Sequence, residues 1–244
     1  MSALTDARDA IAAQAEAVIT WADGLTAAEL AAPSGLEGWT VRDVLGHLVV
    51  SVGRLTDLPG SPSTENPIPL HLYVRAYRPL AADIEAQAKG VEGDPRPALK
   101  AARDAGLASI DGGIPAVVQA MRGPMRDADS LLTRAIELIT HSVDLGAPLD
   151  RGALELVVRT FAQMLADTAP GRSVELRIPP FAAVQIIDGQ THRRGTPPAV
   201  VEISPTDWIR LATGRITWAA AADDGTVRAS GVRSDLSPYL PLLS

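Results

Sequence analysis

A glutamate and a histidine four residues apart, Glu137 and His141, could act together on a metal ion. The stretch 127–145 has the spacing of an amphipathic helix, with apolar residues over about half of the cylinder. Side chains at i and i+4 lie one above the other on a helix, so this carboxylate and imidazole could grip one ion. The alternative is a solvated face, because any surface helix carries a polar stripe opposite an apolar one. That stripe comprises Ser130, Thr133, Glu137, Thr140, His141 and Asp144.

The sequence also predicts where this helix begins and ends. Asp127 or Asp129 is expected to cap the free N–H groups of the first turn. Gly146 favours a left-handed cap and Pro148 cannot continue a helix, so both predict an end near residue 145.

A second histidine, His47, lies on another predicted helix, which begins after the cap residue Thr40. Asp43, three residues later, predicts a capping box with Asp in place of Glu. His47 falls just outside the apolar arc of this helix, at a seam between core and surface. By itself it is equally compatible with a surface residue or with an inter-helix hydrogen bond.

The remaining elements of the first part are predicted to be mainly helical. Residues 57–69 contain four prolines and predict a loop, and Pro79 predicts a kink or split in a helix over 70–89. Residues 110–126 leave a short helix and an extended segment both open. Further helices are predicted at 5–23, 26–32, 95–109 and 151–168.

After residue 170 the helical period gives way to short β-type runs, which predicts a compact α+β unit of about 75 residues. Ser204 and Pro205 predict the start of a helix over 205–213, and 236–243 a last short helix or turn. Strands are predicted at 174–178, 183–187, 200–203 and 226–230. We therefore expect two domains, 1–169 and 170–244.

Composition narrows the function classes. The chain has 244 residues, of which 46% are hydrophobic and 21% charged, with a net charge of −7, so a globular protein is expected. It has no dense basic run, which argues against nucleic-acid binding, and no run of about 20 apolar residues, which argues against a membrane span. The first residues lack the pattern of a signal peptide, and a cytoplasmic location is expected. The absence of cysteine excludes disulfides, cysteine–zinc sites and a cysteine nucleophile.

Two stretches together resemble the mycothiol-dependent maleylpyruvate isomerase family. They are GWTVRDVLGHL at 38–48 and TRAIELITHSVDL at 133–145. The resemblance implies a DinB-like up-and-down helical bundle, in which His47, Glu137 and His141 hold a divalent metal, usually zinc. Three such ligands leave a fourth position open, which is typical of a catalytic zinc site. His71 is an alternative ligand if the bundle geometry differs, and His192 has no assigned role.

The C-terminal part resembles a small sterol-carrier-like domain that is attached to many actinobacterial members of this family. The similar stretches are IPPFAAVQ at 178–185, RGTPP at 194–198 and WIRLATGR at 208–215. Only Lys89 and Lys100 of the 22 basic residues are lysines, a bias that fits a GC-rich genome such as those of actinobacteria.

The resemblance implies an enzyme that uses mycothiol as cosubstrate and acts as an isomerase or S-transferase on a small anionic electrophile. Because arginine binds carboxylates with two parallel hydrogen bonds, and family members use arginines from both domains, Arg75 and Arg215 are the candidate catalytic residues. Asp43 or Asp144 could orient a ligand histidine. The alternative function is a carrier of an apolar ligand with a vestigial metal site. The sequence does not predict an oligomeric state.

Overall fold

In a computed structural model, the chain is described at residues 2–76, 81–189 and 199–243. It divides into two compact units. The helical unit comprises Met1–Pro69 and Arg78–Leu154, and the sheet unit comprises Leu70–Tyr77 and Glu155–Ser244. The division falls inside the helix predicted at 151–168, ahead of the expected domain boundary at 169/170. That boundary stays a prediction about which segments fold independently.

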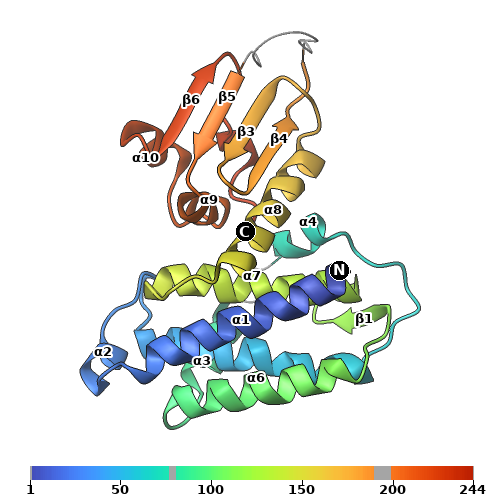
Figure 1. The fold of residues 1–244 in the computed structure, drawn as a ribbon, viewed down its shortest axis with the longest axis vertical. Helices are drawn as coiled ribbons and strands as arrows, with labels where there is room; N and C mark the ends of the chain where they lie inside the picture. The colour runs from blue at the N-terminus through green and yellow to red at the C-terminus, as the bar shows by residue number, and fades with distance from the viewer. Residues whose placement is uncertain (1, 77–80, 190–198, 244) are drawn as a thin grey trace. The chain divides into compact units, whose positions relative to one another are not determined.

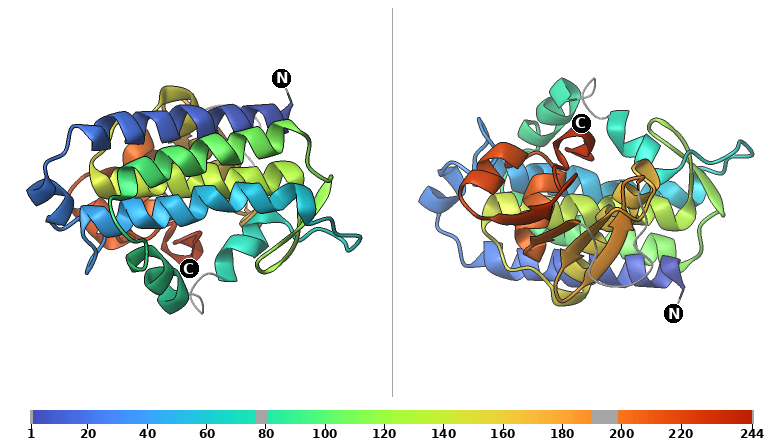
Figure 2. Two further views of the ribbon diagram at one scale, coloured as in Figure 1. Left: turned by 90° about the horizontal axis from the view of Figure 1, so that it is seen from below. Right: turned by 90° about the horizontal axis from the view of Figure 1, so that it is seen from above.

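Four long helices form the helical unit and run side by side (Figures 1 and 2). Each packs against two others, in the cyclic order α1, α7, α3, α6. This is the predicted up-and-down bundle, closed around one apolar core. The helices are α1 (Ala3–Asp23), α3 (Val41–Gly53), α6 (Pro95–Asp111) and α7 (Asp127–Leu145), joined by the shorter α2 (Ala27–Ala31), η1 (Arg54–Gly60) and α5 (Ala81–Lys89).

The residues at the start of α3 and at both ends of α7 can be compared with the predicted caps. Thr40 and Asp43 form the predicted capping box at the start of α3. At the start of α7 the cap residue is Arg126, whose side chain makes no capping bond, and the carboxylate of Asp127 accepts only the adjacent Ala128 N–H. Asp127 therefore accepts one free N–H group of the first turn, as predicted, but it is not the N-cap residue of the helix. Gly146 ends α7 with φ 65°, in the left-handed conformation predicted for it.

The structure resolves two uncertain regions of the sequence. Residues 110–126 contain an antiparallel hairpin of β1 (Val117–Ala120) and β2 (Gly123–Arg126) that leads directly into α7. The helix predicted over 70–89 is divided into α4 (Leu70–Tyr73), η2 (Val74–Ala76) and α5. Pro79, the predicted cause of the split, lies outside the described residues.

The sheet unit contains a four-stranded sheet with the order β4-β3-β5-β6 (Figure 1). β3 is antiparallel to β4 and parallel to β5, and β5 is antiparallel to β6. The elements are α8 (Arg151–Thr168, whose first four residues belong to the helical unit), β3 (Val174–Ile178), β4 (Ala182–Ile186), β5 (Ala199–Ile203), α9 (Pro205–Ala212), α10 (Trp218–Asp223), β6 (Val227–Gly231) and η4 (Ser237–Tyr239). Every predicted strand is present, whereas α10 was not predicted.

The central strands bury alternate residues, the period expected of a sheet with one covered face. In β3 the buried positions are Val174, Leu176 and Ile178, and in β5 they are Ala199, Val201 and Ile203. Trp208 of α9 and Phe161 of α8 are fully buried. The interior of this unit is therefore almost wholly apolar. No helix in the described part of the chain is long and apolar enough to cross a membrane.

Candidate metal centre

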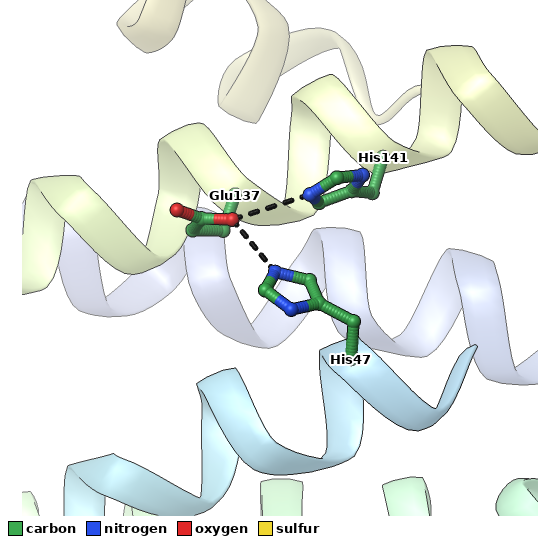
Figure 3. A group of neighbouring side chains, drawn as sticks. All are labelled: His47, Glu137 and His141. Carbon is green, nitrogen blue, oxygen red and sulfur yellow. Dashed lines mark hydrogen bonds and ion pairs between the residues drawn. The ribbon is translucent and has the colours of Figure 1, made fainter. Parts of the chain in front are cut away.

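Three side chains from two helices converge on one point in the helical unit (Figure 3). His47 Nε2 lies 2.9 Å from Glu137 Oε2, and His141 Nε2 lies 3.3 Å from the same oxygen. One potential ligand atom from each residue lies within 4.8 Å of the other two. The bundle thus brings together residues ninety positions apart in the chain.

The polar stripe of α7 is buried and does not form a solvated face. Thr133, Thr140 and Asp144 are 3%, 4% and 5% exposed, and His141 is 8% exposed. His47, which the sequence placed at a seam, is 9% exposed. Burying polar groups is unfavourable unless they bind a partner, so this burial argues for a structured site.

Asp144 fixes the orientation of His141. Its Oδ2 lies 2.9 Å from His141 Nδ1, so Nδ1–H can donate to the carboxylate while Nε2 faces Glu137. Asp43, the other candidate for such a role, instead accepts hydrogen bonds from the backbone N–H and hydroxyl of Thr40. The geometry therefore favours Asp144 as the partner of the histidine.

Aromatic packing holds His47 from the other side. The Trp39 ring meets the His47 ring edge-on at a centroid distance of 6.1 Å, and the rings of His47 and His141 lie 4.6 Å apart at 69°. The loop before Trp39 is tied to α7, because Gly35 N–H donates to the carbonyl of Asp144 at 2.6 Å. Next to His47 in sequence, Gly46 allows α5 to approach α3, since a Cβ there would lie 2.5 Å from the Ala88 carbonyl oxygen.

The electrostatics of the triad favour an ionised carboxylate between the two imidazoles. Burial acts to raise the pKa of Glu137, but hydrogen bonds from His141 and His47 outweigh it and hold that pKa well below its usual value. Burial and the charge of His141 lower the pKa of His47. Burial also acts to lower the pKa of His141, but the hydrogen bonds to Asp144 and Glu137 prevail and raise it.

The donor set of this site fits a divalent metal. Two imidazole nitrogens and one carboxylate oxygen are the ligands of many catalytic zinc sites, and the hydrogen bond from His141 Nδ1 to Asp144 is the usual support of a ligating histidine. Both histidines present Nε2 to the same carboxylate oxygen, so a single ion could contact all three residues.

Arg134 lies one turn before Glu137 on α7 and bridges to α3. Its Nη1 donates to the carbonyl oxygen and the hydroxyl of Ser51, both at 3.3 Å. Its Nε and Nη2 both donate to Thr133 Oγ1 at 3.1 Å. The sequence reasoning did not single out this arginine, although its spacing of three residues from Glu137 places both on one helix face.

The two arginines predicted to be catalytic lie in the sheet unit. Arg75, in η2, is exposed and its Nη2 lies 3.4 Å from Thr168 Oγ1. Arg215 Nη1 donates to the carbonyl of Thr213 at 3.1 Å. Their catalytic roles stay predictions. His71, the alternative ligand, is also in the sheet unit, in α4, and His192 lies outside the described residues.

Comparisons with known proteins match both parts of the chain. Residues 11–146, more than half of the chain, match the family described as the mycothiol maleylpyruvate isomerase N-terminal domain. Residues 150–242 match the family described as bacterial SCP ortholog. None of the curated proteins compared with the chain matches it.

Two solved structures share the fold. One is a crystal structure of the mycothiol-dependent maleylpyruvate isomerase, 18% identical, with a TM-score of 0.54. The other is a variant of that isomerase with a histidine replaced by alanine, 19% identical, also with a TM-score of 0.54. Each alignment covers 93% of this chain and 91% of the other.

These matches confirm the predicted fold class, the resemblance of both parts and the expectation of an enzyme family. The alignments span both units of this chain, so the shared fold includes the helical bundle and the small sheet domain. The chain belongs to the mycothiol maleylpyruvate isomerase N-terminal domain family.

Proposed function

We propose that this protein is a zinc-dependent isomerase or S-transferase that uses a low-molecular-weight thiol, mycothiol, and acts on a small anionic electrophile. The observation that carries the proposal is the buried convergence of His47, Glu137 and His141 in a chain of this family. Such a donor set supports a metal centre with a vacant coordination position, which is the arrangement of catalytic zinc sites.

In this proposal His47 and His141 would hold the ion through Nε2, and Glu137 would hold it through a carboxylate oxygen. The chemistry that zinc would supply here is activation of a bound thiol, whose pKa it would lower toward neutral pH. The thiol must come from outside, because the chain has no cysteine.

Two neighbouring residues would orient the histidines of the site. Asp144 accepts the Nδ1 proton of His141 at 2.9 Å and thereby keeps Nε2 available. Trp39 packs on His47 and limits its rotation. Because the triad is largely buried, its charges are screened less than at the surface and act strongly on a bound ligand. Arg75 and Arg215 are proposed to bind carboxylates of the substrate or thiol conjugate.

A second candidate function follows from the C-terminal match. The bacterial SCP ortholog description of residues 150–242 supports a carrier of an apolar ligand, in which the metal site has lost its role. The two functions differ in what the purified protein should contain.

The decisive experiment measures metal content and bound lipid in the purified full chain, and then thiol-transfer activity with mycothiol and a panel of small anionic electrophiles. The enzyme proposal expects stoichiometric zinc that is lost in both His47→Ala and His141→Ala, together with zinc-dependent activity. His71→Ala, the same change outside the triad, is the matched control and should retain zinc. Protein without metal affinity but with co-purified lipid would overturn the proposal in favour of the carrier.

A further inference from the structure

Two connections between α3 and α7 lie one helical turn apart. The first joins His47 to Glu137, and the second joins Ser51 to Arg134. Ser51 follows His47 by four residues, whereas Arg134 precedes Glu137 by three, as expected for antiparallel helices with facing polar residues. With a rise of 1.5 Å per residue, the Arg134 position lies roughly 5 Å along α7 from the carboxylate that joins the two histidines.

The partners of Arg134 are all uncharged. Its four hydrogen bonds go to the Ser51 carbonyl, the Ser51 hydroxyl and the Thr133 hydroxyl. Within the described ranges of the chain, no carboxylate oxygen lies within the 4.0 Å of an ion pair with this guanidinium. A guanidinium has five N–H donors, so at least one is left for another acceptor.

Three other arginines of the helical unit are paired with carboxylates, whereas Arg42 donates to the carbonyls of Val91 and Gly93. Arg8 binds the Asp111 carboxylate through two nitrogens, Arg96 binds Asp94, and Arg103 contacts both Glu16 and Asp104. Arg134 is instead held by neutral oxygens while half-buried. Such a cation keeps its full charge and a fixed orientation, and both properties favour the binding of an anion.

We propose that Arg134 is a further anion-binding residue, beside the proposed Arg75 and Arg215: it binds a carboxylate of the substrate and holds the electrophile one helical turn from His47, Glu137 and His141. This inference rests on the proposed function and deepens it, because it places the recognition of the substrate's charge in the helical unit itself. The opposing interpretation is that Arg134 is only a strut between α3 and α7.

The test measures binding of succinate, a small unreactive dicarboxylate, to the full chain by calorimetry, with zinc-loaded and metal-free protein. Its dimethyl ester is the uncharged probe. Arg134→Gln should weaken succinate binding by about ten- to a hundred-fold, the range for a charged hydrogen-bonded contact, and should not affect the ester. Arg134→Lys keeps the positive charge but lacks the planar guanidinium that can make two parallel hydrogen bonds. This variant should therefore lose less succinate affinity than Arg134→Gln.

Two controls separate anion binding from a structural role. Arg126→Gln makes the same change of charge at the exposed start of α7 and should change succinate affinity less than about two-fold, because exposed charges at this distance are screened. Ser51→Ala weakens the strut and retains the cation, so succinate should still bind. If Arg134→Gln fails to fold, Arg134→Lys carries the test against the same controls.

The outcomes distinguish this inference from the proposed function. Equal affinity of Arg134→Gln and Arg126→Gln for succinate, or no saturable binding by the wild type, would overturn the anion-binding role. If Ser51→Ala and Arg134→Gln lost equal affinity for succinate, the anion-binding role would also be overturned. Arg134 would then be only a structural link between α3 and α7. Zinc content, measured in the same samples, tests the metal centre separately: zinc that survives His47→Ala would contradict the proposed function whatever succinate does.

Discussion

The two units of this protein differ in what they bury. Of the eleven buried polar or charged residues among those described, nine lie in the helical unit and two, Ser173 and Thr213, lie in the sheet unit. Six of the nine are on α7 and two are on α3. Polar burial is unfavourable unless each group finds a partner, so it concentrates where it serves a site.

The units also differ in charge. The helical unit carries 12 basic and 20 acidic residues, a net of −8, whereas the sheet unit carries 10 basic and 9 acidic residues, a net of +1. An acidic domain repels anions at long range, and this repulsion is screened by salt. An anionic substrate therefore needs a local cation at the site, and the position of Arg134 within the acidic unit meets that need.

The comparison places the candidate metal site in the helical unit and leaves the sheet unit with an almost wholly apolar interior. Its sharpest test is Phe161→Ala in α8, because this ring is fully buried in the apolar interior of the sheet unit. Removing the ring leaves a cavity and should lower the free energy of unfolding by about 3–5 kcal/mol. Urea denaturation followed by circular dichroism measures the loss, and Phe161→Leu, which keeps more of the volume, should lose much less.

The zinc content of folded Phe161→Ala should equal that of the wild type. Loss of zinc under conditions where this variant remains folded would contradict the placement of the candidate metal site in the helical unit.

A second prediction tests the packing that holds His47. At Gly46 an added Cβ would lie 2.5 Å from the Ala88 carbonyl oxygen, so α3 or α5 must shift in Gly46→Ala. We expect a loss of about 1–3 kcal/mol in the free energy of unfolding, the usual range for overpacking. Gly53, at the end of the same helix, has no heavy atom within 4 Å of such a Cβ.

Gly53→Ala is therefore the matched control for Gly46→Ala. It should be neutral or stabilising by up to about 1 kcal/mol, because alanine favours the helix. Urea midpoints of the two variants measure the difference. Equal stabilities would show that α3 and α5 are not in close contact at this position.

A third prediction tests the support of His141. Asp144→Asn removes the charge that accepts the Nδ1 proton of the histidine, and loss of such a partner lowers metal affinity by about ten- to a hundred-fold. The effect is measured by competition for zinc with a chelator of known affinity. Asp43→Asn makes the same chemical change at the cap of α3 and should leave zinc affinity unchanged while lowering stability by about 1 kcal/mol.

If Asp43→Asn weakened zinc binding as much as Asp144→Asn does, the assignment of Asp144 as the specific partner would be wrong. These two variants also compare two carboxylates of the helical unit. They distinguish Asp144, which orients a histidine of the site, from Asp43, which only caps a helix.

The long helices and the pairing of Glu137 with His141 could be predicted from the sequence because their signals are local. The four-residue spacing of Glu137 and His141 places them on one face of any helix, and Thr40 with Asp43 marks a helix start. His47 required the resemblance, since no local rule connects residues ninety positions apart. The β1–β2 hairpin escaped prediction because its strands have only four residues each and one contains both Gly123 and Pro124.

The sequence could not predict what covers each polar helix face. Periodicity identifies the stripe on α7 but does not say whether water or another helix covers it, so the buried and solvated alternatives stayed open. The choice between Asp43 and Asp144 was open for the same reason, as both are near a histidine in sequence. Arg134 was overlooked because an arginine on a polar stripe is ordinary until its partners are known to be neutral.

The smallest predicted effect concerns Thr140, which lies between the proposed ligands Glu137 and His141 in sequence. Its hydroxyl is buried and has no hydrogen-bond partner in the described part of the chain, so it is unfavourable for folding. Thr140→Val replaces the hydroxyl by a methyl group of similar shape and should stabilise the protein by up to about 1 kcal/mol, with zinc affinity unchanged. Thermal unfolding with and without zinc measures both quantities. A less stable Thr140→Val protein, or one that binds zinc more weakly, would show that the Thr140 hydroxyl makes a hydrogen bond in the folded protein. This buried hydroxyl would then also contribute to the candidate metal site.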